Sequence, residues 1–215
     1  FTFTTDQKQR ARQQLQLTPD SIVVLYMGRL SFHAKAHPLA MYQALQRVAE
    51  QINVPLVLVE CGWHANQAIT DAFRQAAQLA CPAVRIEQLD GRQPAQRDLA
   101  WAAADIFCSL SDNIQETFSQ VVVEGMASGL PVVAAAATGS QNLVANGRSG
   151  RLIPPGAVHQ FAEALQGYIE DAALRQTHGN AGEKRSRDFS WDQINQVVAD
   201  TYIRLIRQKA ALVGR

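Results

Sequence analysis

The 215-residue sequence predicts one α/β domain built on a doubly wound parallel sheet. Between residues 18 and 155, short apolar runs alternate with segments of helical spacing. Each run is continuously apolar, which is typical of strands covered by helices on both faces. Right-handed crossovers between such strands bring them into a parallel sheet. We therefore expect a Rossmann-like fold, with a core at about 18–156 and further helices at about 157–212.

The elements can be placed in order along the chain. The apolar runs predict strands at 22–27, 54–60, 84–87, 106–110 and 131–136. Helical spacing and end signals predict helices at 7–16, 38–51, 66–80, 94–104 and 118–128, and three more at 158–167, 171–187 and 191–208. The last helix carries an apolar stripe that includes Trp191, Val198 and Leu205, so we expect it to pack on another surface.

Charge and composition exclude several classes of protein. Twenty Lys and Arg against 19 Asp and Glu leave a net charge of +1, without the basic excess of a nucleic-acid or anionic-membrane surface. No apolar run approaches the ~18–20 residues that span a bilayer. Three scattered cysteines and no signal pattern predict a reducing, cytoplasmic location. The start at Phe1, without Met, predicts a chain cut from a longer one.

Polar residues gather where three of the predicted strands end. In an open parallel sheet, ligands bind outside the carboxyl ends of the strands. Gly28, Arg29 and then Lys35 follow the first strand, residues 109–120 follow the fourth, and 137–140 follow the fifth. Charge-assisted bonds from Arg29 and Lys35 would suit a phosphate, although either residue can equally be a solvated loop charge.

The segment 116–131 predicts an anion site at a helix start. Thr117 and Gln120 have capping-box spacing, which places Thr117 at the N-cap and the amides of Phe118, Ser119 and Gln120 in the first turn. Such amides lack intrahelical acceptors and favour a bound phosphate. Beyond the helix, Gly129 suits a left-handed terminating position.

Two glutamates bracket this site: Glu116 precedes the cap, in the loop, and Glu124 lies within the helix, eight positions later. Burying a carboxylate among apolar residues is costly unless it is hydrogen-bonded, so Glu124 is a candidate acceptor for paired sugar hydroxyls. The plainer alternatives are a solvated helix face for Glu124 and complementation of the helix dipole for Glu116.

Together these residues resemble a known family. Residues 116–134, ETFSQVVVEGMASGLPVVA, are similar to the Glu-x7-Glu signature of the retaining, GT-B-fold glycosyltransferases of group 1, or family 4. The GRL string at 28–30 with Lys35, the NGRSGRLIPP turn at 146–155 and the FSW string at 189–191 resemble other motifs of that family. The resemblance covers nearly the whole chain and implies the C-terminal, donor-binding domain of such an enzyme, without its N-terminal acceptor-binding domain.

The resemblance also implies roles. Arg29 and Lys35 would bind the donor diphosphate and stabilise the leaving nucleotide, and Glu116 would contact the transferred sugar. Gly28, Thr117 and the amides of Phe118, Ser119 and Gln120 would belong to the donor site, Glu124 would bind the ribose, and the base would lie near Gln88 and Leu89. The implied reaction is a metal-independent hexosyl transfer with no bound cofactor, and the missing domain leaves peripheral membrane contact open.

The sequence departs from the family at three places. Ser119 stands where Gly is usual, the segment between Arg29 and Lys35 is long and carries His33, and the turn at 87–91 lacks the usual pattern. Rival folds fit less well, because the chain has no Gly-x-Gly-x-x-Gly dinucleotide loop after its first strand, no phosphate-binding Gly-Lys-Ser/Thr loop and no Gly-x-Ser-x-Gly elbow. The alternative left open is a non-catalytic nucleotide-sugar-binding module, inactive without its partner domain.

Overall fold

The computed structural model describes residues 2–32, 35, 37–113 and 116–213. Its sheet has six strands in the order β3-β2-β1-β4-β5-β6, and every neighbouring pair is parallel. The strands are β1 (Ile22–Arg29), β2 (Leu56–Trp63), β3 (Arg85–Asp90), β4 (Ile106–Ser109), β5 (Val132–Ala135) and β6 (Gly150–Ile153). This order confirms the predicted doubly wound, Rossmann-like sheet. Strands β2 and β3 extend the sheet on one side of β1, and β4, β5 and β6 extend it on the other, so the strand order reverses between β1 and β4.

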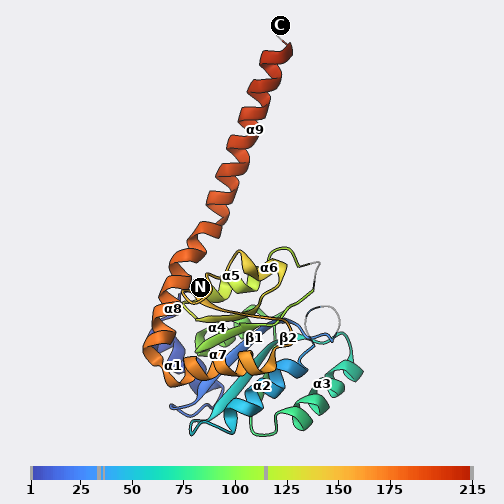
Figure 1. Ribbon diagram of the computed structural model, residues 1–215, viewed down its shortest axis with the longest axis vertical. Coiled ribbons are helices and arrows are strands. Elements are labelled where there is room, and N and C mark those ends of the chain that lie inside the picture. The colour runs from blue at the N-terminus through green and yellow to red at the C-terminus, as the bar shows by residue number, and fades with distance from the viewer. Residues whose placement is uncertain (1, 33–34, 36, 114–115, 214–215) are drawn as a thin grey trace.

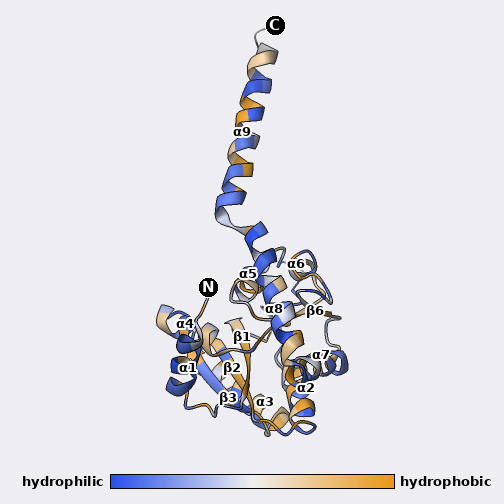
Figure 2. Ribbon diagram, turned by 90° about the vertical axis from the view of Figure 1, so that its left-hand side faces the viewer, coloured by the Kyte–Doolittle hydropathy of each residue, from blue (hydrophilic) through white to orange (hydrophobic). Residues whose placement is uncertain are grey.

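Helices cover both faces of the sheet (Figures 1 and 2). The helices are α1 (Thr5–Gln14), α2 (Leu39–Ala49), α3 (Gln67–Ala80), α4 (Pro94–Ala103), α5 (Gln120–Ala127), the short α6 (Thr138–Gln141), α7 (Val158–Glu170), α8 (Ala172–Ser186), the 3-10 turn η1 (Arg187–Phe189) and α9 (Trp191–Val213). Buried side chains of α2, α3 and α7 share one apolar cluster, while those of α1, α4 and α5 share the other.

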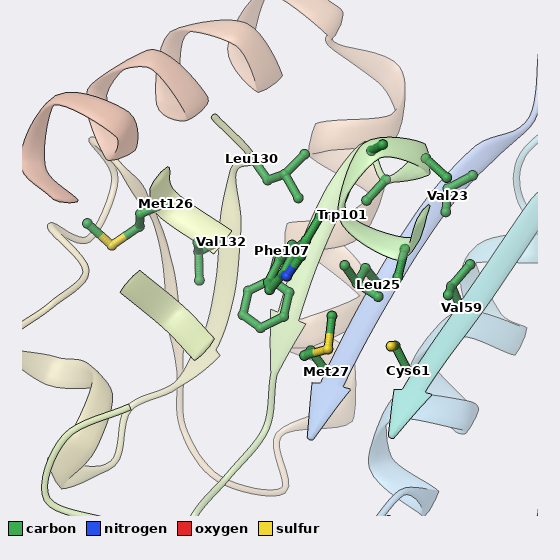
Figure 3. Close-up of a cluster of buried hydrophobic side chains, with 14 of the residues drawn as sticks. Val23, Leu25, Met27, Val59, Cys61, Trp101, Phe107, Met126, Leu130 and Val132 are labelled. Carbon is green, nitrogen blue, oxygen red and sulfur yellow. The ribbon is translucent and has the colours of Figure 1, made fainter. Parts of the chain in front are cut away.

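The period-two alternation of β1 divides the core between these two layers. Val23, Leu25 and Met27 point into the cluster beneath α1, α4 and α5, where Trp101 and Phe107 pack with ring centroids 5.1 Å apart (Figure 3). Val24 and Tyr26 point to the opposite face, toward α2 and α3. A strand buried on both sides accounts for the continuous apolar runs in the sequence.

Local end signals explain several helix boundaries. The side chain of Thr4 accepts a hydrogen bond from the amide of Gln7, forming the predicted capping box of α1, and Asn66 caps α3. At the end of α5, Gly129 has φ +70°, and its amide and that of Leu130 donate to the carbonyls of Met126 and Gly125. This arrangement is a Schellman motif, in which glycine avoids the steric cost of left-handed backbone.

Three parts of the structure differ from the sequence expectations. The segment 146–155, expected to be a turn, contains the turn and then strand β6. Helix α5 begins at Gln120 rather than at 118. Helix α9 projects away from the domain, with Trp191, Val198 and Leu205 exposed, so its predicted packing partner does not lie in the described part of this chain (Figure 1).

Candidate functional site

A cavity of about 420 Å³ opens at the carboxyl end of the sheet. It receives Gly28 and Arg29 from the end of β1 and Ser109 and Ser111 from the end of β4. These two strands flank the point where the strand order reverses, which is where open α/β sheets bind ligands. Its other lining residues are Tyr26, Met27, Lys35, Cys61, Trp63, Gly91, Arg97, Glu116, Phe118, Gln120, Val121 and Glu124.

Close packing of two strand ends forms one wall of the cavity. A Cβ added to Gly62 would lie 1.9 Å from the carbonyl oxygen of Gly28, so only glycine fits there. Arg29 lies beside Trp63 in the register of β1 and β2, and its guanidinium carbon is 6.0 Å from the indole centroid. This distance is within the range of a cation–π contact, which orients Arg29 at the cavity.

The start of α5 differs from the predicted capping box. Ser119, not Thr117, is the N-cap, and no side chain caps the helix. The amide of Ser119 donates to the carbonyl of Gly139 at 3.1 Å, which ties this end to the segment after β5 and uses up one of the three amides expected to face a ligand. Of the residues predicted for this anion site, Phe118 and Gln120 line the cavity, whereas Thr117 and Ser119 do not.

Glu116 and Lys35, predicted from separate motifs, meet in the cavity. The Lys35 ammonium donates to Oε2 of Glu116 at 2.9 Å, and the Ser111 hydroxyl donates to the same oxygen. Burial alone would raise the pKa of Glu116, but the hydrogen bonds from Ser111 and Lys35 and the nearby Ser119 hydroxyl hold it below the ordinary value. Glu116 is therefore an ionised acceptor, and its counter-ion Lys35 also lines the cavity.

Glu124 has the opposite character. It lies one helical turn beyond Gln120, whose amide donates to its Oε1 at 3.3 Å. Burial raises the pKa of this carboxyl, and the positive charge of Arg97 only partly offsets the effect. The Glu124 side chain is half-buried and lines the cavity, so it is less exposed than a fully solvated helix face; its contact with a ligand stays a prediction.

The base-site residues Gln88 and Leu89 do not line this cavity. Strand β3 continues to Asp90, three residues beyond its predicted end, so both residues lie within the strand. The Gln88 amide donates to the buried Glu60 at 3.2 Å, and Leu89 packs into the core beneath α4. Gly91, the first residue after β3, lines the cavity.

Trp63 and Arg97 are among the cavity residues that the sequence analysis missed. Trp63 lies at the true end of β2, three residues past the predicted end. Arg97 lies on α4, and its guanidinium donates to the carbonyl of Gly91 at 2.9 Å. The turn-forming Asp90-Gly91 pair was the signal that could have corrected the end of β3 and directed attention to the following helix.

The described residues lack two features that would point to other classes of protein. They contain no group of three His, Cys, Asp or Glu side chains arranged to hold a metal ion. None of their helices has the length and apolarity needed to cross a membrane. His33, noted as a departure from the family pattern, lies outside the described residues.

Comparison with known proteins identifies the family. The family model for glycosyl transferases group 1 matches residues 7–185. The chain belongs to the group 1 glycosyl transferases. It is 31% identical over 185 residues to a D-inositol 3-phosphate glycosyltransferase of Corynebacterium glutamicum, covering 85% of this chain and 43% of the relative. The chain thus spans about half the length of the curated relatives it matches.

Solved structures support the same assignment. HepE of Anabaena, crystallised with UDP and glucose, is 28% identical and superposes with a TM-score of 0.73, covering 94% of this chain and 53% of that one. The C-terminal domain of a group 1 protein, LpcC of Francisella tularensis, shares the fold at 19% identity and a TM-score of 0.68, covering 83% of this chain and 90% of that one. The fold is therefore that of a GT-B C-terminal domain.

Proposed function

We propose that this domain binds the nucleotide-diphosphate sugar donor of a retaining, metal-independent hexosyltransferase. The observation that carries the proposal is the convergence of Arg29, Lys35, Glu116 and Glu124 on one cavity beside the start of α5. Arginine and lysine match the charge of a diphosphate, and carboxylates match the hydroxyls of a sugar or ribose. HepE, which was crystallised with UDP-glucose, is 27% identical over nearly the whole chain and supports UDP as the nucleotide to test first.

Different charged residues bind different parts of the donor. Arg29 and Lys35 bind the diphosphate and stabilise the negative charge that develops on the departing nucleotide. Glu116, kept ionised by its neighbours, accepts hydrogen bonds from hydroxyls of the transferred sugar. Glu124 binds the ribose, and the base lies toward Gly91 and Arg97 rather than toward Gln88 and Leu89. Retention of configuration through an oxocarbenium-like transition state follows from the family resemblance.

Calorimetric titration of the 215-residue chain tests this function directly. We expect binding of UDP, GDP or ADP, or of one of their sugar esters, and loss of that binding in Arg29→Ala. Silence from all three nucleotides and their esters would refute the proposal. Lys209→Ala removes the same type of charge from the exposed part of α9 and should leave the affinity unchanged.

We further infer that α9 docks against an acceptor-binding domain of the parent protein. Its residues Trp191, Val198, Tyr202 and Leu205 share one stripe of the helix and are exposed, as is typical of an apolar stripe that packs on another surface. Taken by itself, the chain should then self-associate through this helix, and raising the salt concentration should not reverse the association. Light scattering that reports a strict monomer at high concentration would contradict this docking.

A further inference from the structure

Three separate segments hold Glu116 in place. The Ser111 hydroxyl and the Lys35 ammonium both donate to Oε2 of its carboxylate, Lys35 at 2.9 Å. On the backbone side, a Cβ added to Gly139 would come within 2.6 Å of the Glu116 carbonyl oxygen, so this segment can lie close only because residue 139 is glycine. The side chain of Glu116 is consequently only 12% exposed, although it lines an open cavity.

We propose that Ser111 is a positioning residue, which fixes the Glu116 carboxylate for the transferred sugar while the donor diphosphate engages Lys35. This inference rests on the proposed function, and it assigns a role to a side chain that no family motif quoted above includes. Ser111 acts through Glu116, so its contribution should be confined to donors that carry a sugar.

Ser111 and Lys35, the two residues with a hydrogen bond to Oε2 of Glu116, differ in how firmly they are held. Lys35 is long and 37% exposed, and its ammonium is attracted more strongly to a diphosphate than to a single carboxylate. Ser111 has a short side chain, is buried, and lies two residues after β4, whose Ser109 pairs with Ala134 of β5. When Lys35 turns to the phosphates, the buried hydroxyl remains as the fixed donor to Glu116.

The experiment compares dissociation constants for UDP and UDP-glucose in the 215-residue chain. For Ser111→Ala we expect the UDP constant to stay within about twofold and the UDP-glucose constant to rise at least about tenfold, as for the loss of one hydrogen bond to a charged group. Ser111→Thr keeps the hydroxyl and should restore most of the affinity. In a Glu116→Ala background, adding Ser111→Ala should have no further effect.

Other results would overturn the proposal. Equal weakening of UDP and UDP-glucose would show a general structural role, and additive losses in the double variant would show that Ser111 touches the donor itself. A wild-type chain that binds UDP but excludes UDP-glucose would show that Glu116 does not receive a glucosyl group. Failure of the wild-type chain to bind any nucleotide refutes the proposed function instead, so the two failures can be told apart.

Discussion

Replacing Lys35 tests the electrostatics of the cavity most sharply, because Lys35 has two tasks there. In the proposed site its ammonium is a donor for the diphosphate, and in the structure it is the counter-charge of Glu116, whose Oε2 lies 2.9 Å away. A lost charge-assisted bond to phosphate costs about 1.5–3 kcal/mol, so Lys35→Ala should weaken UDP binding about 10- to 150-fold. In the full-length enzyme we expect turnover to fall by roughly 10²–10³, as for other preorganised charge stabilisers.

The role of Lys35 as counter-charge of Glu116 leads to a further prediction. Without Lys35, the ionised Glu116 repels the incoming diphosphate. At roughly 6 Å, the repulsion of two unit charges is about 0.7–2.8 kcal/mol for effective dielectric constants between 80 and 20. Because Lys35 is 37% exposed, solvent screening favours the lower half of this range. Lys35→Ala/Glu116→Ala should therefore bind UDP about three- to twentyfold more tightly than Lys35→Ala alone.

Isothermal titration calorimetry with UDP, at low and at physiological salt, measures both effects. Lys209→Ala is the matched control, since it removes a lysine from the exposed part of α9. An unchanged affinity in Lys35→Ala would mean that Lys35 is an ordinary solvated charge. A double variant no tighter than Lys35→Ala would show that Glu116 does not face the phosphates.

Three further variants test other parts of the domain. Because burial raises the pKa of Glu124, UDP affinity should already weaken at pH values somewhat above 4.5 as the carboxyl protonates. Glu124→Gln should remove this part of the pH dependence, and calorimetric pH profiles that coincide for the wild type and the variant would contradict the ribose contact. Gly62→Ala places a Cβ 1.9 Å from the Gly28 carbonyl oxygen and should cost about 1–3 kcal/mol of stability, lowering the thermal midpoint by several degrees. The control Gly167→Ala adds a Cβ with no atom within 4 Å and should not lower the midpoint. Equal midpoints for the two variants would disprove the close approach of Gly62 to Gly28. Burial also raises the folded-state pKa of Glu60 above its ordinary 4.5, so its contribution to the free energy of unfolding is fully present below pH 4.5 and is lost as the pH rises through the folded-state pKa. In urea unfolding Glu60→Gln should lack this decline, and parallel pH profiles of the wild type and the variant would refute the prediction.

The extent to which sequence predicted the site follows from which signals are local. Apolar runs and end residues are local, and they placed five of the strands and the end of α5 at Gly129. The end of β3 depends instead on pairing with β2, where Gly62 lies beside Asp90, so the predicted strand ended too early and Gln88, expected after the strand, lies within it. Sequence also favoured a capping box at 117–120, whereas the tertiary bond from Ser119 to Gly139 starts the helix later.

The apolar stripe of α9 also shows what a local sequence pattern can and cannot predict. Helical spacing correctly predicted one helix at this end of the chain, and an amphipathic stripe argues that something covers it. In the described part of this chain the stripe is uncovered, and Trp191 is 71% exposed. A periodic pattern therefore predicts a packing partner without indicating which segment supplies it.

The near-neutral composition and the proposed anion site are compatible because the relevant charge is local. A net charge of +1 over 215 residues predicts no general attraction for polyanions. Within the cavity, however, Arg29, Lys35 and Arg97 lie beside Glu116 and Glu124. A sugar nucleotide has the complementary pattern, since its diphosphate is anionic while its sugar and ribose present hydroxyl donors. A simple polyanion would meet the two carboxylates as well as the three cations, so the same balance that hides the site from composition would select a donor carrying both phosphate and sugar.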